Sequence, residues 1–149
     1  MFYPDLSNEC PMDHGDHVRA IGWLGEGHPF AVGPVPPEFL AALRTHIDSA
    51  WQPVVCVGPH FCDFCPEPRA GKRSRKSRPG ASGNVWIPAT GVVYVAPELI
   101  VHYIEVHQYR PPDEFVAAVL ACPNQGSAEF HDRLRQFPRS WDPPTSRHD

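Results

Sequence analysis

The sequence predicts an α+β fold in which a small antiparallel sheet or hairpin is flanked by helices. Two runs rich in β-branched and aromatic residues, 84–88 and 91–97, are separated by two residues, which is typical of a hairpin. Four other segments carry apolar residues three and four positions apart, the spacing of one helix face. The chain has 149 residues, of which 42% are hydrophobic, so it is long enough to enclose one core without disulfides.

Prolines indicate where the helices begin, because proline fixes φ and is tolerated in the first helical turn. The first helix is expected after Pro36 and Pro37. Its apolar face is expected to consist of Phe39, Leu40, Leu43, Ile47 and Trp51. The remaining expected helices are 97–108, 111–121 and 127–137, and further strands are expected within 18–24 and 54–57.

The chain divides into three parts on this interpretation. These are an N-terminal extension at residues 1–16, a single α+β domain at residues 17–138 with a basic loop at 69–83, and a flexible tail at 139–149.

The longest apolar run is far shorter than the roughly 20 residues that cross a membrane. Acidic residues precede the first basic side chain, unlike a secretory signal peptide. A cytoplasmic protein without a membrane partner is therefore expected.

Cysteine and histidine residues form the most informative pattern. Residues 60–65 read His-Phe-Cys-Asp-Phe-Cys, so Cys62 and Cys65 have the C-x-x-C spacing that lets one tight turn direct two sulfurs at a tetrahedral ion. His102 and His107 follow on an expected helix, with a spacing found in zinc sites. Residues five apart on a regular helix point about 140° apart, so both imidazoles reach one ion only if the last turn is distorted or ends there.

The order of these parts, a cysteine turn, a hairpin and then a helix with the remaining ligands, resembles a treble-clef zinc domain. A structural zinc ion bound by Cys62, Cys65, His102 and His107 is the leading interpretation, with His60 competing for either histidine position and Cys56 as an outside candidate. Alternatively, the two cysteines are a redox pair, or the two histidines are ordinary polar positions of the helix. No amphipathic helix directly follows Cys65, which disfavours a thioredoxin-like motif.

Basic residues are concentrated between the cysteine turn and the hairpin. Six of the 13 lysines and arginines lie within residues 69–78, which leaves seven basic residues against 17 acidic ones in the rest of the chain. Such a loop attracts polyanions in a salt-dependent way. The candidate contacts for nucleic acid or another polyanion are Lys72, Arg73, Arg75 and Lys76. The alternative is a solvated insertion, and no aromatic residue interrupts the run to stack on bases.

The segment 99–112 reads Leu-Ile-Val-His-Tyr-Ile-Glu-Val-His-Gln-Tyr-Arg-Pro-Pro. Together with the H-x-C-x-x-C turn, it resembles a family of small uncharacterised bacterial proteins that pair such a turn with an L-I-x-H-Y-I-x-x-H-x-Y-x-P-P helix. The resemblance implies that His60, Cys62, Cys65, His102 and His107 belong to one site. It implies no activity.

Three classes of function remain open from the sequence. The first is a zinc-stabilised interaction module that binds a protein or nucleic acid. The second is a zinc-dependent hydrolase or nuclease in which Glu105 or a spare histidine acts as the base. The third is an immunity or accessory protein that neutralises a basic partner through its acidic body. Common nucleotide-binding and hydrolase motifs are absent from the sequence.

Overall fold

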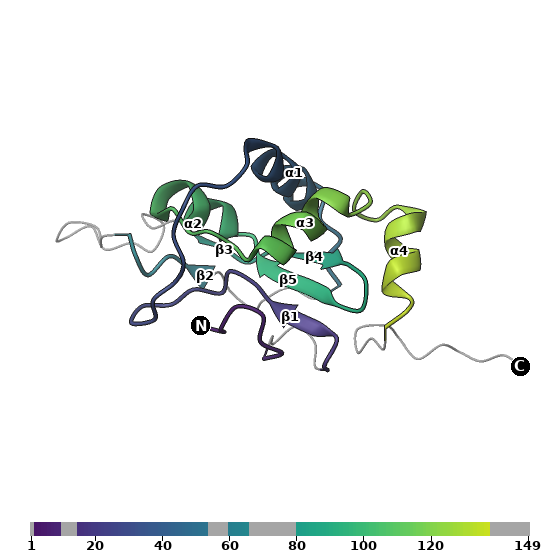
Figure 1. The fold of residues 1–149 in the computed structure, drawn as a ribbon, viewed down its shortest axis with the longest axis horizontal. Helices are drawn as coiled ribbons and strands as arrows, with labels where there is room; N and C mark the ends of the chain where they lie inside the picture. The colour runs from purple at the N-terminus through teal and green to yellow at the C-terminus, as the bar shows by residue number, and fades with distance from the viewer. Residues whose placement is uncertain (1, 10–14, 54–59, 66–79, 138–149) are drawn as a thin grey trace, which may run out of the picture.

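A three-stranded sheet lies beneath three helices in the computed structural model, which describes residues 2–9, 15–53, 60–65 and 80–137 (Figure 1). The strands are β1 (Val18–Ala20), β4 (Asn84–Pro88) and β5 (Val93–Pro97), in the order β1-β5-β4. A separate two-stranded sheet pairs β2 (His60–Phe61) with β3 (Gly80–Ala81). The helices are α1 (Pro37–Asp48), α2 (Ile100–His107), α3 (Asp113–Ala121) and α4 (Ala128–Leu134).

The α+β class and the hairpin are confirmed. Strands β4 and β5 pair antiparallel from Asn84↔Pro97 to Pro88↔Val93, and the turn is closed by a 2.8 Å bond from the Ala89 amide to the Val92 carbonyl. The hairpin is part of a mixed sheet, because β1 pairs parallel to β5. Parallel pairing needs a long connection, and here the connection from β1 to β5 includes α1 and the cysteine turn.

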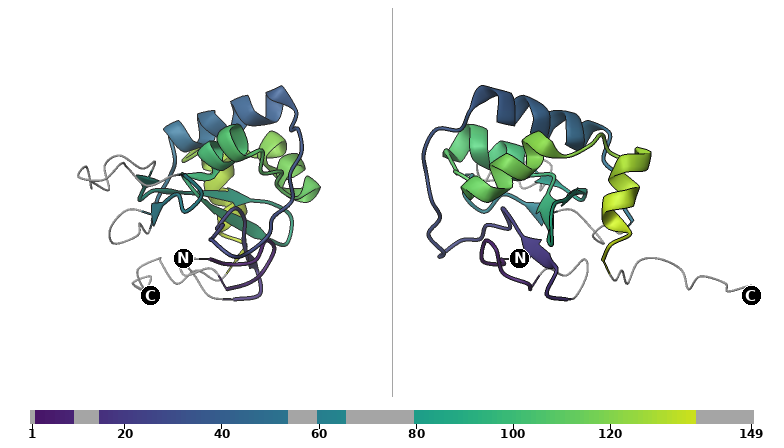
Figure 2. Two further views of the ribbon diagram at one scale, coloured as in Figure 1. Left: turned by 90° about the vertical axis from the view of Figure 1, so that its left-hand side faces the viewer. Right: turned by 45° about the vertical axis from the view of Figure 1, so that its right-hand side comes forward.

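Both faces of the sheet are buried, which explains why its strands are nearly continuous apolar runs. Alternate residues of the hairpin, such as Ile87 and Tyr94, face a core shared with α1, α2 and α3. Their neighbours Trp86 and Val95 face a second core, which includes Phe130 and Leu134 of α4. The two further views show α1, α2 and α3 gathered over one side and α4 beside the end of the sheet (Figure 2).

Two expected elements are shorter than their apolar patterns. The strand within 18–24 stops at Ala20, and the chain leaves the extended conformation at Gly22, which has a φ of +76°. The first helix ends at Asp48, and Trp51 instead packs edge-on against Trp86 and Phe130. The strand expected at 54–57 lies outside the described residues.

The beginning of the chain packs along β1. The amides of Tyr3 and Leu6 donate to the carbonyls of Trp23 and Ala20, at 3.0 and 2.8 Å. The boundaries proposed for an extension, a domain and a tail remain predictions. Within the described ranges, no helix combines the length and apolar character needed to cross a bilayer.

A buried histidine joins α1 to the chain beyond α3. His46 is 6% exposed, and its Nε2 lies 3.3 Å from the Val119 carbonyl oxygen. Its Nδ1 lies 3.4 Å from Nε2 of Gln125, which also donates to the Trp86 carbonyl. These partners fit the neutral imidazole with its proton on Nε2, because Gln125 can donate only to an unprotonated Nδ1. Burial lowers the pKa of His46, and the Val119 hydrogen bond only partly offsets this effect.

The lowered pKa of His46 predicts a loss of stability in mild acid. Between the folded-state pKa and the ordinary value of 6.5, the unfolded chain binds more protons than the folded one, so the free energy of unfolding falls as the pH falls. We expect this fall to be smaller in His46→Gln than in the wild type, measured by denaturant unfolding at pH 7.5 and 5.5. Other titrating groups are common to both proteins and cancel in the difference. An identical pH dependence in both proteins would contradict the role given to His46.

Candidate metal centre

The cysteine turn follows directly from β2. Strand β2 pairs with β3 through His60↔Ala81 and Phe61↔Gly80, which fixes the start of the turn. Within it, the Phe64 amide lies 3.4 Å from Cys62 Sγ, a typical contact of a metal-binding turn. The Phe64 ring packs 5.5 Å from the His107 ring and 6.0 Å from the Tyr103 ring, between centroids. Phe64, one of the two residues between the cysteines, thus packs the turn against α2.

The end of α2 brings the two histidines together. Gln108 adopts the left-handed conformation with a φ of 56°, and its amide donates to the Tyr103 carbonyl, five residues earlier rather than four. The Tyr109 amide reaches the same carbonyl at 3.1 Å. This wide turn resembles a π-type turn, and such turns are frequent at functional sites. It places the His102 and His107 rings 5.1 Å apart between centroids. The distortion expected from the five-residue spacing is present.

Distances between the four side chains match a tetrahedral ion site. Cys62 Sγ lies 3.4 Å from His107 Nε2, and Cys65 Sγ lies 3.3 Å from His102 Nε2 and 3.6 Å from His107 Nε2. A tetrahedral zinc ion with ordinary Zn–S and Zn–N bonds separates sulfur and nitrogen ligands by about 3.5 Å. One ligand atom from each of the four residues lies within 4.8 Å of the others. Cys62, Cys65, His102 and His107 are therefore close enough to hold one metal ion.

The electrostatics of the cluster favour neutral groups when no cation is bound. Burial raises the pKa of the Cys62 thiol, and hydrogen bonds from the Phe64 and Cys65 amides partly offset this effect. Burial lowers the pKa of His102, and the nearby His107 lowers it further. A divalent cation replaces the thiol protons and compensates the buried sulfur charge, so the binding of a metal releases protons.

The structure describes the other predicted site residues unevenly. For His60 only the backbone pairing in β2 is described, so its role as a ligand stays a prediction. The basic candidates Lys72, Arg73, Arg75 and Lys76 lie outside the described residues. Glu105 is exposed, and its carboxylate forms an ion pair with Arg44 of α1. It is not part of the metal-binding group found among the described residues.

A half-buried carboxylate that the sequence did not indicate supports the end of α2. Asp5 accepts a 2.7 Å hydrogen bond from the Tyr109 hydroxyl and a 2.9 Å bond from the Gly22 amide. Burial raises the pKa of Asp5, and these two hydrogen bonds oppose that effect. No local pattern connects residues 104 positions apart, so sequence reasoning had no signal for this pair.

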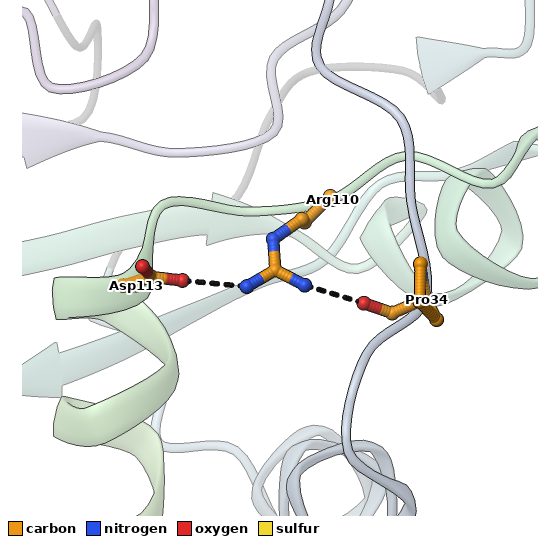
Figure 3. A network of polar contacts seen from close by, with 3 residues as sticks. All are labelled: Pro34, Arg110 and Asp113. Carbon is orange, nitrogen blue, oxygen red and sulfur yellow. Dashed lines mark hydrogen bonds and ion pairs between the residues drawn. The ribbon is translucent and has the colours of Figure 1, made fainter.

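Arg110 fixes the chain just beyond the site (Figure 3). Its guanidinium donates to the Pro34 carbonyl at 2.6 Å and to the Asp113 carboxylate at 2.8 Å. Backbone hydrogen bonds also tie residues 108–110 to residues 31–33. The Gly33 amide donates to the Gln108 carbonyl, and the Arg110 amide donates to the Ala31 carbonyl. The left-handed residue after α2 is thus held by bonds to a segment that precedes α1.

Comparison with known protein families shows which family the chain belongs to. A family model described as Domain of unknown function (DUF7919) matches residues 1–120. The chain belongs to this family. The DUF7919 match includes all four side chains of the metal-binding group and ends within α3, before α4. No curated protein and no solved structure matches the chain. The expected resemblance to an uncharacterised family is confirmed, while its bacterial origin and shared motifs stay predictions.

The left-handed conformation of Gln108 gives a test of the local geometry. A β-branched residue is strained at positive φ, so Gln108→Val should destabilise the fold by about 1–2 kcal/mol and lower the metal content by displacing His107. Glycine adopts this conformation without strain, so Gln108→Gly should keep both stability and metal content near those of the wild type. Denaturant unfolding and metal analysis measure both effects. Equal behaviour of the two variants would show that the wide turn does not depend on this residue.

Proposed function

We propose that this DUF7919 protein is a zinc-stabilised interaction module whose ion is structural. The observation that carries the proposal is the set of three sulfur–nitrogen distances of 3.3–3.6 Å between the cysteine turn and α2. Two thiolates and two imidazoles are a ligand set that zinc favours over harder cations. Because free thiols persist in reducing compartments, a cytoplasmic location fits this site.

A structural role follows from the number of protein ligands. Catalytic zinc ions usually have three protein ligands and keep a fourth position for water or substrate, whereas structural ions have four. Here the ligand atoms of four side chains lie within 4.8 Å of one another, so together they can occupy all four positions of a tetrahedral zinc ion. Glu105, the base considered for a hydrolase, is paired with Arg44 instead. These features favour a module over the zinc-dependent hydrolase.

For the interaction itself, we propose that the basic residues between β2 and β3 contact a polyanion. Lys72, Arg73, Arg75 and Lys76 follow Cys65 in the sequence and precede β3. The rest of the chain carries an excess of acidic residues, so cationic contacts with nucleic acid or an acidic protein would concentrate on this segment. If the protein is instead an immunity or accessory protein, the excess of acidic residues in the rest of the chain would bind its basic partner.

The zinc proposal predicts one zinc ion per chain, measured by elemental analysis of protein purified without added metal. Cys62→Ser and His107→Ala should each lose most of this zinc and destabilise the fold by more than about 4 kcal/mol, as expected for the loss of a structural metal.

Matched controls for these variants are Cys122→Ser and His28→Ala, whose side chains are not in the group. Both should retain their zinc and most of their stability. A purified chain without zinc that folds normally, and that neither adding nor chelating zinc changes, would contradict the proposal. Zinc-site variants that stay folded but lose a hydrolytic activity would favour the enzyme.

The polyanion proposal predicts a change in salt dependence. Replacing Lys72, Arg73, Arg75 and Lys76 together by glutamine should weaken binding to double-stranded DNA and lower the slope of log K against log salt by roughly 3–4. The double variant Arg133→Gln and Arg135→Gln, on or next to α4, is the control and should change the slope little. Fluorescence anisotropy at several salt concentrations measures both. Equal slopes for the wild type and the fourfold variant would exclude nucleic acid as the target of these residues.

A further inference from the structure

The two kinds of ligand in the candidate centre come from different elements. Both sulfurs belong to the turn after β2, and both nitrogens belong to α2, whose last residue is His107. The sulfurs of Cys62 and Cys65 lie within 4.8 Å of each other and neither belongs to α2, so an S–S bond between them requires movement within the turn only. Joining them removes both metal ligands that the turn supplies, and α2 would retain only its imidazoles.

The two sulfurs also differ in their access to solvent. Cys62 has no exposed surface, whereas Cys65 is partly exposed. Cys65 is therefore the more accessible of the two residues to a small oxidant, and the buried Cys62 next to it is suited to act as the resolving thiol. Both are free cysteines in this structure. A solvent-accessible cysteine next to a resolving cysteine is the arrangement found in redox-sensing pairs.

A third free cysteine provides an internal comparison. Cys122 is partly exposed, and its thiol lies 3.2 Å from the Pro123 carbonyl oxygen. Burial raises its pKa to about 12, so it remains a poorly reactive thiol near neutral pH. It does not belong to the metal-binding group. Its replacement should leave the chemistry of the centre unchanged.

We propose that Cys62 and Cys65 form a peroxide-sensitive switch that releases the zinc ion, an inference that rests on the proposed zinc function. The Cys65 sulfur attacks one oxygen of a peroxide, the O–O bond breaks, hydroxide leaves, and Cys65 becomes a sulfenic acid. The Cys62 sulfur then attacks the Cys65 sulfur and displaces a second hydroxide as the S–S bond forms. The two thiolates lose two electrons, the peroxide is reduced by two, and two protons convert both hydroxides to water. With two of the four ligands consumed in the disulfide, His102 and His107 alone would not retain a zinc ion.

Other contacts of the turn survive this step. Phe64 still packs against Tyr103 and His107, and the Asp63 carboxylate still accepts from the Glu26 amide at 3.3 Å. The core shared by the sheet, α1, α2 and α3 includes Cys62, but its other members are apolar side chains whose packing involves no sulfur–metal bond. The oxidised chain should therefore lose the tie between the turn and α2, together with the stabilisation that the zinc ion provides.

The experiment uses the full-length chain loaded with zinc and titrated with hydrogen peroxide. A chromogenic chelator reports released zinc, and peptide mass spectrometry identifies the oxidised cysteines. The wild type should release about one zinc per chain with a Cys62–Cys65 disulfide, and a thiol reductant should restore binding. Cys122→Ser should behave like the wild type. Cys65→His keeps four ligands with a single sulfur, so it should bind zinc but release it at least tenfold more slowly in peroxide.

Each alternative outcome has a defined meaning. A chain that binds no zinc when reduced overturns the proposed function and this inference with it. Zinc that stays bound in peroxide overturns the switch alone. Zinc release with sulfinic or sulfonic acid at Cys65 and no disulfide also overturns the switch, because that loss would not be reversible by a thiol reductant. Equal release rates in the wild type and Cys65→His would show that the sulfur pair is not the sensor.

Discussion

The candidate metal centre depends on how α2 ends. A regular α-helix would direct His102 and His107 to different sides, and no single ion could contact both. The left-handed Gln108 and the hydrogen bond across five residues widen the last turn, and the two rings come to lie side by side. The bonds made by Tyr109 and Arg110 to distant segments hold this ending in place. Strain at one residue is thus compensated by contacts elsewhere in the fold.

This dependence explains why a short helix and a short turn can form a site between them. The turn has little regular structure of its own, since β2 and β3 contribute only two residues each. Phe64 gives it one aromatic contact surface toward α2, and a shared ion would give it the remainder. Small structural zinc sites commonly stabilise segments that bury too little apolar surface to be ordered alone. The proposed zinc ion and the packing of Phe64 would therefore both hold the cysteine turn against α2.

Much of the fold could be predicted because its patterns are local. Prolines mark the beginnings of α1 and α3, and a short turn separates the two apolar strands of the hairpin. The parallel pairing of β1 could not be predicted, because nothing within residues 18–20 specifies a partner more than seventy residues later. At the site, the spacing of two cysteines and two histidines indicated the metal-binding group. The five-residue spacing of the histidines also required a distorted helix end. The Asp5–Tyr109 hydrogen bond was missed because it pairs one acidic residue with one buried tyrosine across most of the chain.

Membership in the DUF7919 family supplies no activity, so the chemistry of the centre is the main guide to function. X-ray absorption at the zinc edge of the purified, reduced chain tests the central claim most directly. We expect a first shell of two sulfur ligands at about 2.3 Å and two nitrogen ligands at about 2.0–2.1 Å. A first shell made of nitrogen and oxygen alone would contradict the account, because it would place any bound zinc away from Cys62 and Cys65.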